Sequence, residues 1–381
     1  MFLNIKSRID QLVGKQIVFQ DPLIADGTNS NDHKYGTSAA EAAFIYKVTG
    51  DVRYFDLSKR LLEKVIEYYE YRNSHQLNIS WYVYSRLHAL MAYDWIYNDL
   101  SEAEKISIGR SLFNALEFML PSTSRSNFYR ENRSGIDGGF YNNQAMEWYL
   151  GLVFHGTGVN DTKALEILKR GYDSHKSVLQ YRENASGDDG GAASGTLPYC
   201  LADYPWAENN FFHSFMSATG GYNITTQYDY LPNFVSYLYW NLLPQNREFG
   251  FGDAHHTDNS IDFAIINMHL SQLVHFYGDR FPMHASVARY IMNELYPRKV
   301  NEPTSFPMAR FFLTNKHEGV SAFNPSKSLP KARYFESMGQ FFMRSGSGPD
   351  DTYATFTVSS NLLNHKHYDN NNFLIYKKGF V

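Results

Sequence analysis

The chain has 381 residues, of which 43% are hydrophobic and 19% are charged, so it can bury one large core, or one large domain and part of a second. Its net charge of −4 argues against a general nucleic-acid binder, which carries a basic surplus. A single cysteine excludes an intramolecular disulfide and a cysteine-rich metal site. No apolar run reaches the roughly 18 residues of a membrane span, so no span is expected.

The N-terminal stretch MFLNIKSRIDQLVGKQ (1–16) lacks the long apolar segment of a signal peptide. Either the chain stays inside the cell or its leader has been removed. Aromatic residues reach 16%, with 29 Tyr and 28 Phe. Tyrosine suits a groove that binds sugars, because sugar faces are apolar and sugar edges form hydrogen bonds. A compositional bias of the genome would raise tyrosine equally, and both explanations stay open.

Up to about residue 300 the pattern predicts helix after helix, joined by short polar breaks. The SEAE run at Ser101 resembles a capping box, and Gly50 is a good residue to end a helix. No fixed-period repeat is visible, which disfavours a consensus solenoid and leaves a looser stack of helical pairs or a closed ring of them. The expected helices are Thr37–Thr49, Asp56–Tyr71, Trp81–Tyr97, Ser101–Leu120, Tyr141–Phe154, Asp161–Tyr181, Glu208–Thr219, Tyr228–Leu243, Ser260–Tyr277 and Pro282–Leu295.

The period changes after about residue 330, where residues alternate in twos. Arg333–Arg344, Thr352–Ser360 and Asn372–Lys378 favour Tyr, Phe, Thr and Val, which predicts three strands. Three strands with an apolar face need a partner sheet, and none follows in the sequence. We therefore expect a β-domain whose remainder is absent, so that the chain is a fragment or an early-terminated product.

A polar helix start stands out in GGFYNNQAMEWYLGLVF (138–154). Asn142, Asn143 and Gln144 open the expected helix, and Glu147 lies one turn beyond Gln144 on the same face. A capping role explains these residues without a ligand, because Asn is a good N-cap and Glu its usual companion. Taken alone, the stretch favours the capping role.

Two loops carry further candidates. The glycine- and aspartate-rich stretch 183–212 is long for a compact helical domain, and such loops are often functional. It presents three aromatic residues before the next helix, and a flexible connector with stray aromatics is the alternative. The loop 247–258 carries His255 and His256, but adjacent histidines point in different directions and seldom bind one metal ion, so a loop without a metal is favoured.

Histidines alternate near the end of the chain, just before an apolar run. In a strand, His365, His367 and Asp369 would project from one face, since alternate residues share a side. Such a face can bind zinc, which needs at least three ligands, or place one histidine in a groove while the other braces the sheet. The pattern alone leaves both roles open.

The order of these features resembles the heparinase II/III-like polysaccharide lyases. An Asn-Asn-Gln helix start, a glycine-rich loop leading to tyrosine and NHKHYDNNNFLIYKKG follow one another, and TGDVRYFDLSKRLLE is similar to the family's helical-pair sequence. The resemblance implies a mainly α fold, an incomplete (α/α) toroid of helical hairpins followed by the beginning of an antiparallel β-sandwich, with the active site in the cleft between them. It places the toroid at 1–310, a linker at 311–330 and an incomplete β-domain at 331–381.

The same resemblance implies β-elimination at a uronic acid. Asn143 or Gln144 matches the family's neutraliser of the substrate carboxylate, and Tyr199 matches its base, which then serves as the acid. His365 matches the catalytic histidine, which the resemblance places on the first strand of the β-domain. His367 matches a metal-binding position whose other ligands would lie beyond residue 381. No cofactor is required, and a complete β-domain would have room for structural zinc or calcium.

The implied partner is an anionic polysaccharide, handled by a periplasmic or secreted bacterial protein, and the oligomeric state stays open. Arginines in SRSNFYRENRSG can grip carboxylates or sulfates with two parallel hydrogen bonds, and a solvated loop is the equal alternative. The expected substrate contacts are Asn142, Glu147, Arg130, Arg133, Tyr204, Trp206 and His255.

One residue departs from the family pattern. Several members carry His where this chain has Gln144, and that His acts as a second base that widens the range of uronic epimers. Without it, we expect syn elimination by Tyr199 alone, on glucuronate- or mannuronate-type units. Two rivals stay open: a glycoside hydrolase on the same toroid, which needs two carboxylates such as Asp188, Asp189 or Asp253, and a polysaccharide-binding module without activity.

Overall fold

Contacts divide the chain into two compact units. The N-terminal unit comprises residues 1–135 and 141–176, and the C-terminal unit comprises residues 136–140 and 177–381. The domain boundaries predicted at residues 310 and 330 stay predictions. Within the described residues, no helix is both long and apolar enough to cross a membrane. The computed structural model describes residues 2–18, 35–75, 77, 84–120, 143–186, 188–191, 197, 210–245, 247–252, 263–295, 319–358, 367 and 370–379.

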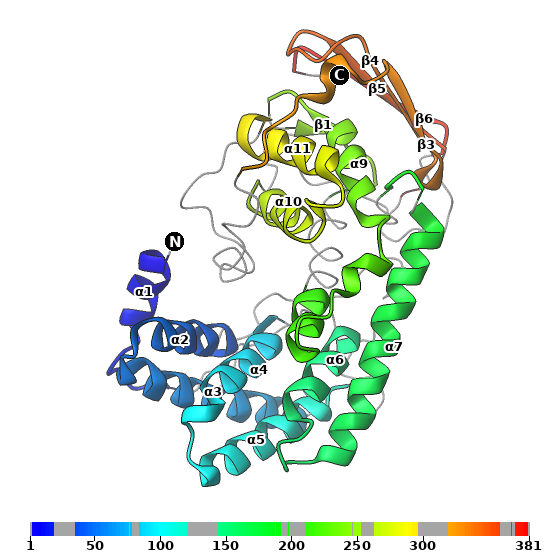
Figure 1. Ribbon diagram of the computed structural model, residues 1–381. Coiled ribbons are helices and arrows are strands. Elements are labelled where there is room, and N and C mark those ends of the chain that lie inside the picture. The colour runs from blue at the N-terminus through cyan, green and yellow to red at the C-terminus, as the bar shows by residue number, and fades with distance from the viewer. Residues whose placement is uncertain are drawn as a thin grey trace. The chain divides into compact units, whose positions relative to one another are not determined.

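The N-terminal unit is built from helical hairpins (Figure 1). Helix α2 packs on α3 and α4, α4 packs on α6, and α3 packs on α5, so α2, α4 and α6 form one row and α3 and α5 another. The expected helices of this unit are confirmed, with ends shifted by up to a few residues, and α1 is an addition. Their bounds are α1 Phe2–Asp10, α2 Tyr35–Thr49, α3 Val52–Ser74, α4 Tyr84–Ile96, α5 Glu102–Glu117, α6 Asn143–Phe154 and α7 Asp161–Ser186, of which residues 161–176 belong to this unit.

Local signals set several of these helix ends. The capping box of α5 is confirmed: the Ser101 hydroxyl accepts the Glu104 N–H at 3.3 Å, and the Glu104 carboxylate accepts the Ser101 N–H at 2.9 Å. Gly50 ends α2 with φ +71°, a conformation that costs glycine little, and its N–H bonds to the Tyr46 carbonyl at 2.7 Å.

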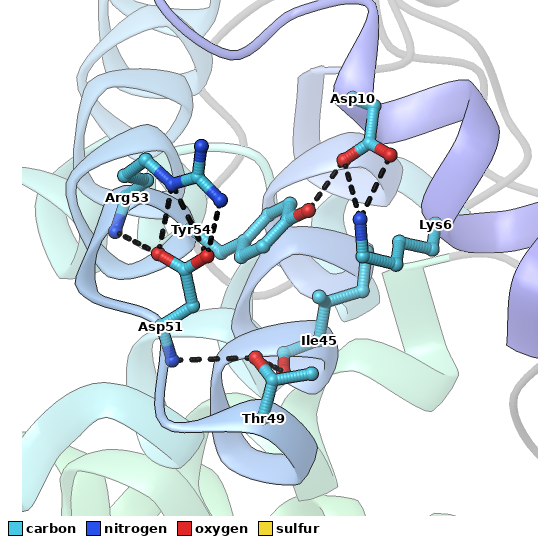
Figure 2. Close-up of polar contacts among 7 residues, drawn as sticks. All are labelled: Lys6, Asp10, Ile45, Thr49, Asp51, Arg53 and Tyr54. Atoms are coloured by element: carbon cyan, nitrogen blue, oxygen red, sulfur yellow. Dashed lines mark hydrogen bonds and ion pairs between the residues drawn. The ribbon is translucent and has the colours of Figure 1, made fainter.

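Helix α1 is held against α3 by a polar cluster (Figure 2). The Asp10 carboxylate accepts hydrogen bonds from the Tyr54 hydroxyl and from Lys6 Nζ, the latter at 2.8 Å. Both bonds lower the pKa of Asp10, the one from Lys6 more than the one from Tyr54. Ile5 and Ile9 of α1 are buried. Two inward apolar residues are too few to predict a helix from periodicity, which is why the sequence missed it.

Helices α6 and α7 approach each other so closely that only glycine fits at the contact. A Cβ on Gly151 would overlap the backbone of Leu168, and a Cβ on Gly171 would overlap the backbone of Trp148. The two helices therefore pack backbone against backbone, which fixes the position of α6 in the N-terminal unit.

The C-terminal unit begins with helices and a short hairpin. The helix expected at Tyr228–Leu243 is wrong as a single element, because the stretch contains one 3₁₀ turn with Pro232, then α9, and ends in a strand. The bounds are a helix at 210–218, the 3₁₀ turns η2 Ile224–Gln227 and η3 Leu231–Asn233, α9 Phe234–Asn241, β1 Leu242–Leu243, β2 Arg247–Glu248, α10 Phe263–Tyr277, α11 Pro282–Tyr290 and the π-turn η4 Ile291–Leu295.

An antiparallel sheet in the order β3-β4-β5-β6 follows, with η5 Pro325–Lys327 before it (Figure 1). The run predicted as one strand at Arg333–Arg344 is two strands, because the turn η6 and Gly339, with φ +59°, reverse the chain between them. The bounds are β3 Ala332–Phe335, η6 Glu336–Met338, β4 Gln340–Arg344, β5 Thr352–Thr357 and β6 Asn372–Lys377.

One face of this sheet packs on α9. The Tyr237 hydroxyl donates to Gln340 Oε1 at 2.8 Å, and the Arg344 guanidinium lies 4.0 Å from the centre of the Trp240 ring. The opposite face carries aromatic rings on neighbouring strands in direct register. These rings remain exposed in the described part of the chain: Tyr334 (54%), Phe341 (37%), Phe356 (36%) and Phe373 (64%).

Candidate active site

The helix start predicted to neutralise a substrate carboxylate lies at one end of the N-terminal unit. Helix α6 begins at Asn143, so Asn143 and Gln144 occupy its first turn, and Asn142 lies outside the described residues. Alternate helices of successive hairpins run parallel, and the Tyr93 ring near the end of α4 stacks on the Phe154 ring at the end of α6, so α2, α4 and α6 begin at the same end. Helix N-termini carry free N–H groups and partial positive charge, which favours a carboxylate at this end.

Contacts between the first turns of α2 and α4 confirm this parallel arrangement. The Gly36 N–H donates to the Ser85 hydroxyl at 3.2 Å, and the Thr37 hydroxyl is hydrogen-bonded to His88 Nδ1 at 2.9 Å. His88 is fully buried, and burial lowers its pKa to about 4. The imidazole is therefore neutral at pH 7 and adds no positive charge at this end.

Glu147, an expected substrate contact, faces α7. Its side chain is 8% exposed, and its Oε1 accepts from Arg170 Nε at 3.3 Å. Arg170 also donates to Glu166 at 2.7 Å. This cross-link between α6 and α7 accounts for the acidic residue without a ligand, and its contact with substrate stays a prediction.

The glycine-rich segment that carries the expected base begins against the sheet. The Asp189 carboxylate accepts three hydrogen bonds: from the Gly191 N–H at 2.8 Å, the Ser337 N–H at 3.0 Å and the Ser337 hydroxyl at 2.7 Å. Farther along, Leu197 is buried, with 1% of its surface exposed. Tyr199, Tyr204 and Trp206 lie outside the described residues.

The histidine motif differs from its predicted placement. His367 is exposed and is not itself in a strand, and it follows β5 in the chain, within the connection 358–371 to β6, so it does not lie on the first strand of the sheet. The Asp- and Asn-rich run explains the error, because these residues favour turns, and Asn371 adopts φ +62° just before β6. His365 and Asp369 lie outside the described residues.

The glycine-rich segment and the histidine connection nevertheless meet the sheet at one place. The turn that holds Ser337 continues to Gly339, whose carbonyl accepts the Val358 N–H at 2.7 Å, the first residue of the connection. The connection returns where the Asn371 N–H donates to the Thr357 carbonyl at 2.9 Å. The segments predicted to carry the phenol and the imidazole therefore start from the same end of the same sheet.

The remaining candidates are not brought together in the described part of the chain. Arg130, Arg133 and His255 lie outside it. Among the residues that the structure does describe, no group of three or more His, Cys, Asp or Glu side chains is placed to hold a metal ion. The metal role of His367 stays a prediction.

A buried polar cluster in the C-terminal unit was not anticipated from the sequence. His213 Nε2 donates to Gln272 Oε1 at 3.2 Å, and the His213 and His275 rings lie 5.4 Å apart. Burial lowers the pKa of His213 to about 4. The available signal was the series of polar residues in an otherwise apolar α10, where Asn267 and His269 are also buried.

Comparison with known proteins supports the fold. No family model and no curated protein matches the chain. A crystal structure of heparinase III matches with a TM-score of 0.51 and 14% identity, covering 91% of this chain and 49% of that one. A heparan sulfate lyase HepC mutant from Pedobacter heparinus matches with a TM-score of 0.49 and 15% identity, over 99% of this chain and 54% of that one.

The chain thus spans about half the length of the heparinase III structure. This chain and the heparinase III structure both have a helical array followed by a β-domain. The fold class predicted from the sequence, a mainly helical toroid followed by an antiparallel β-domain, is confirmed, and the chain has a heparinase-like fold.

Proposed function

We propose that this protein is a polysaccharide lyase that cleaves a uronic-acid-containing polysaccharide by β-elimination. One observation carries the proposal beyond the fold: the segments of Tyr199 and His365 start from the same end of one sheet, and each contacts the turn from Ser337 to Gly339. The heparinase-like fold and the helix start at Asn143 add support.

The reaction breaks the C5–H and C4–O4 bonds and forms a C4–C5 double bond. An amide of Asn143 or Gln144 donates to the substrate carboxylate, so that negative charge can develop on it as the C5 proton leaves. The Tyr199 phenolate takes that proton and returns it to the departing O4. A phenol has a pKa near 10, so the phenolate needs a cation or hydrogen-bond donor beside it, the role proposed for His365.

The proposed substrate class is glycosaminoglycan-like, because the structure matched at a TM-score of 0.51 is named a heparinase, and an alginate-like polymer is the second choice. A periplasmic or secreted location belongs to the same proposal. His367 supplies one proposed ligand for a structural metal. Zinc needs at least three ligands, so no step of the reaction is derived through a metal.

One of the carboxylates proposed for the alternative hydrolase function is engaged in hydrogen bonds within the protein. A retaining or inverting hydrolase needs a carboxylic acid that donates a proton and a second carboxylate that acts as nucleophile or base. Asp189 accepts three hydrogen bonds, which occupies both its oxygens as acceptors. Asp253 lies outside the described residues, and Asp188 remains a candidate carboxylate. Binding without cleavage remains the second rival.

A panel of heparan sulfate, heparin, chondroitin sulfate and alginate separates these functions. Ultraviolet absorbance from a new C4–C5 double bond, rising in step with reducing ends, is the expected result on at least one polymer. Reducing ends without that absorbance would establish hydrolysis. Retention of the protein on an immobilised polymer without either product would establish a binding module, and both outcomes would overturn the proposal.

A further inference from the structure

Asp189 makes the first contact between the Tyr199 segment and the sheet. Its two carboxylate oxygens accept three hydrogen bonds, one from Gly191 and two from Ser337, at 2.7–3.0 Å. Bonds to an ionised carboxylate are roughly twice as strong as those between neutral groups. The two partners, Asp189 and Ser337, are 148 positions apart in the chain, so the contact joins two distant segments rather than capping a local turn.

The backbone beside Asp189 is shaped for this contact. Gly190 adopts φ +85°, and a Cβ there would overlap the Asn233 carbonyl. A Cβ on Gly191 would overlap the Ser337 hydroxyl and lie 2.6 Å from Met338 Cγ. Gly190 therefore lies against the backbone at Asn233, and Gly191 lies directly against the turn between β3 and β4.

The same turn fixes the start of the histidine connection. Two residues beyond Ser337, the Gly339 carbonyl accepts the Val358 N–H at 2.7 Å, where that connection leaves β5. We propose that Asp189 is a positioning residue that sets the Tyr199 segment in register with the His365 connection, through the Ser337 turn. This inference rests on the proposed lyase function, and it assigns no contact between Asp189 and the substrate.

Asp189→Asn tests the role with little change of shape. Asparagine keeps one acceptor oxygen but presents an NH₂ group to at least one donor, so the contact with Ser337 weakens. We expect kcat to fall by about 10- to 100-fold, as for a misplacement of about 1 Å, with KM changed by less than about 3-fold. In a Ser337→Ala background, Asp189→Asn should lower kcat by a smaller factor than it does in the wild type, because the two residues act as one unit.

Asp351→Asn is the matched control on the same sheet. Asp351 accepts the Gly348 N–H at 2.8 Å and the Ser345 hydroxyl at 2.9 Å, the same chemistry confined to the β4–β5 turn. It should leave kcat within about 2-fold of wild type. Hydrogen–deuterium exchange gives a second readout, in which Asp189→Asn, unlike Asp351→Asn, should speed exchange in the peptides covering 187–209 and 336–344.

The two readouts separate failure of this inference from failure of the lyase proposal. Faster exchange in 187–209 together with a lower kcat supports a positioning role. An unchanged kcat in Asp189→Asn, with or without faster exchange, overturns it while the lyase function stands. A wild-type chain that forms no unsaturated product from any polymer overturns the lyase function, and the positioning role falls with it.

Discussion

Gln144 is a residue whose chemistry limits what the proposed site can accept. It lies in the first turn of α6, beside Asn143, at the end where α2, α4 and α6 begin. An amide can donate to a carboxylate, but it has no basic nitrogen with which to take a proton. A site of this composition has one candidate base, the Tyr199 phenol, and therefore one face of the sugar ring from which the C5 proton can leave.

Replacing Gln144 by histidine should add a second base on the other side of the ring. Gln144→His is expected to extend cleavage to the opposite C5 epimer, because a neutral imidazole accepts a proton near pH 7. The measurement is the initial rate of double-bond formation on polymers rich in each epimer. Gln144→Asn is the control and should not broaden the range. Equal epimer preference in Gln144→His and wild type would contradict a single-base site.

At the scale of elements, the two glycines between α6 and α7 decide how α6 is held. Alanine is a better helix former than glycine by about 1 kcal/mol, so in open space Gly171→Ala would stabilise the helix. Here the added Cβ would overlap the Trp148 backbone, which cannot move aside as a side chain could.

We therefore expect Gly171→Ala to lower the free energy of unfolding by about 1–3 kcal/mol or more. Chemical denaturation monitored by tryptophan fluorescence measures the change. Gly319→Ala is the matched control, since nothing lies within 4 Å of its Cβ position, and it should change stability little. A Gly171→Ala variant as stable as Gly319→Ala would show that α6 and α7 lie farther apart than described.

Element ends were predictable where a local signal exists. Ser101 and Gly50 mark helix ends through capping chemistry that depends on a few neighbouring residues. The turn at Gly339 lies inside an alternating run and was misread as part of one strand, because a short turn leaves the period unchanged. Pairing between distant segments carries no local signal at all.

In the candidate site, too, features set by neighbouring residues could be predicted, whereas contacts between distant segments could not. The helix that carries Asn143 follows from the pattern of its neighbours and was predicted from the sequence. The bonds from Ser337 to Asp189 depend on two segments that meet only in the folded chain, so the sequence offered Asp189 merely as a hydrolase carboxylate. A glycine pair after an aspartate was the one available hint.

At the scale of the whole molecule, buried histidines link stability to pH. His88 and His175 are buried, and burial lowers the pKa of each from 6.5 to about 4. Between these values the unfolded chain binds protons that the folded chain does not, so stability falls as pH falls from 6.5 towards 4. The loss is up to about 1.4 kcal/mol per pH unit for each histidine, and the slope fades below pH 4.

Denaturation across this pH range measures the effect. The double variant His88→Asn with His175→Asn should show a shallower slope than wild type between pH 6.5 and about 4. At His175 the asparagine amide can still donate to the Gly171 carbonyl, which the imidazole Nδ1 contacts at 2.8 Å. A wild-type stability that stays flat over this range would contradict the burial of these two rings.

Cleavage in water enriched in heavy oxygen tests the lyase claim most directly, on whichever polymer the panel selects. Elimination breaks the C4–O4 bond without adding water, so fragments analysed before the new reducing end exchanges its oxygen with water should carry no heavy oxygen at the cut and should include one unsaturated end. Tyr199→Phe, which removes the proposed base, should abolish these fragments. Heavy oxygen incorporated at the cut, or undiminished cleavage by Tyr199→Phe, would contradict elimination by this tyrosine.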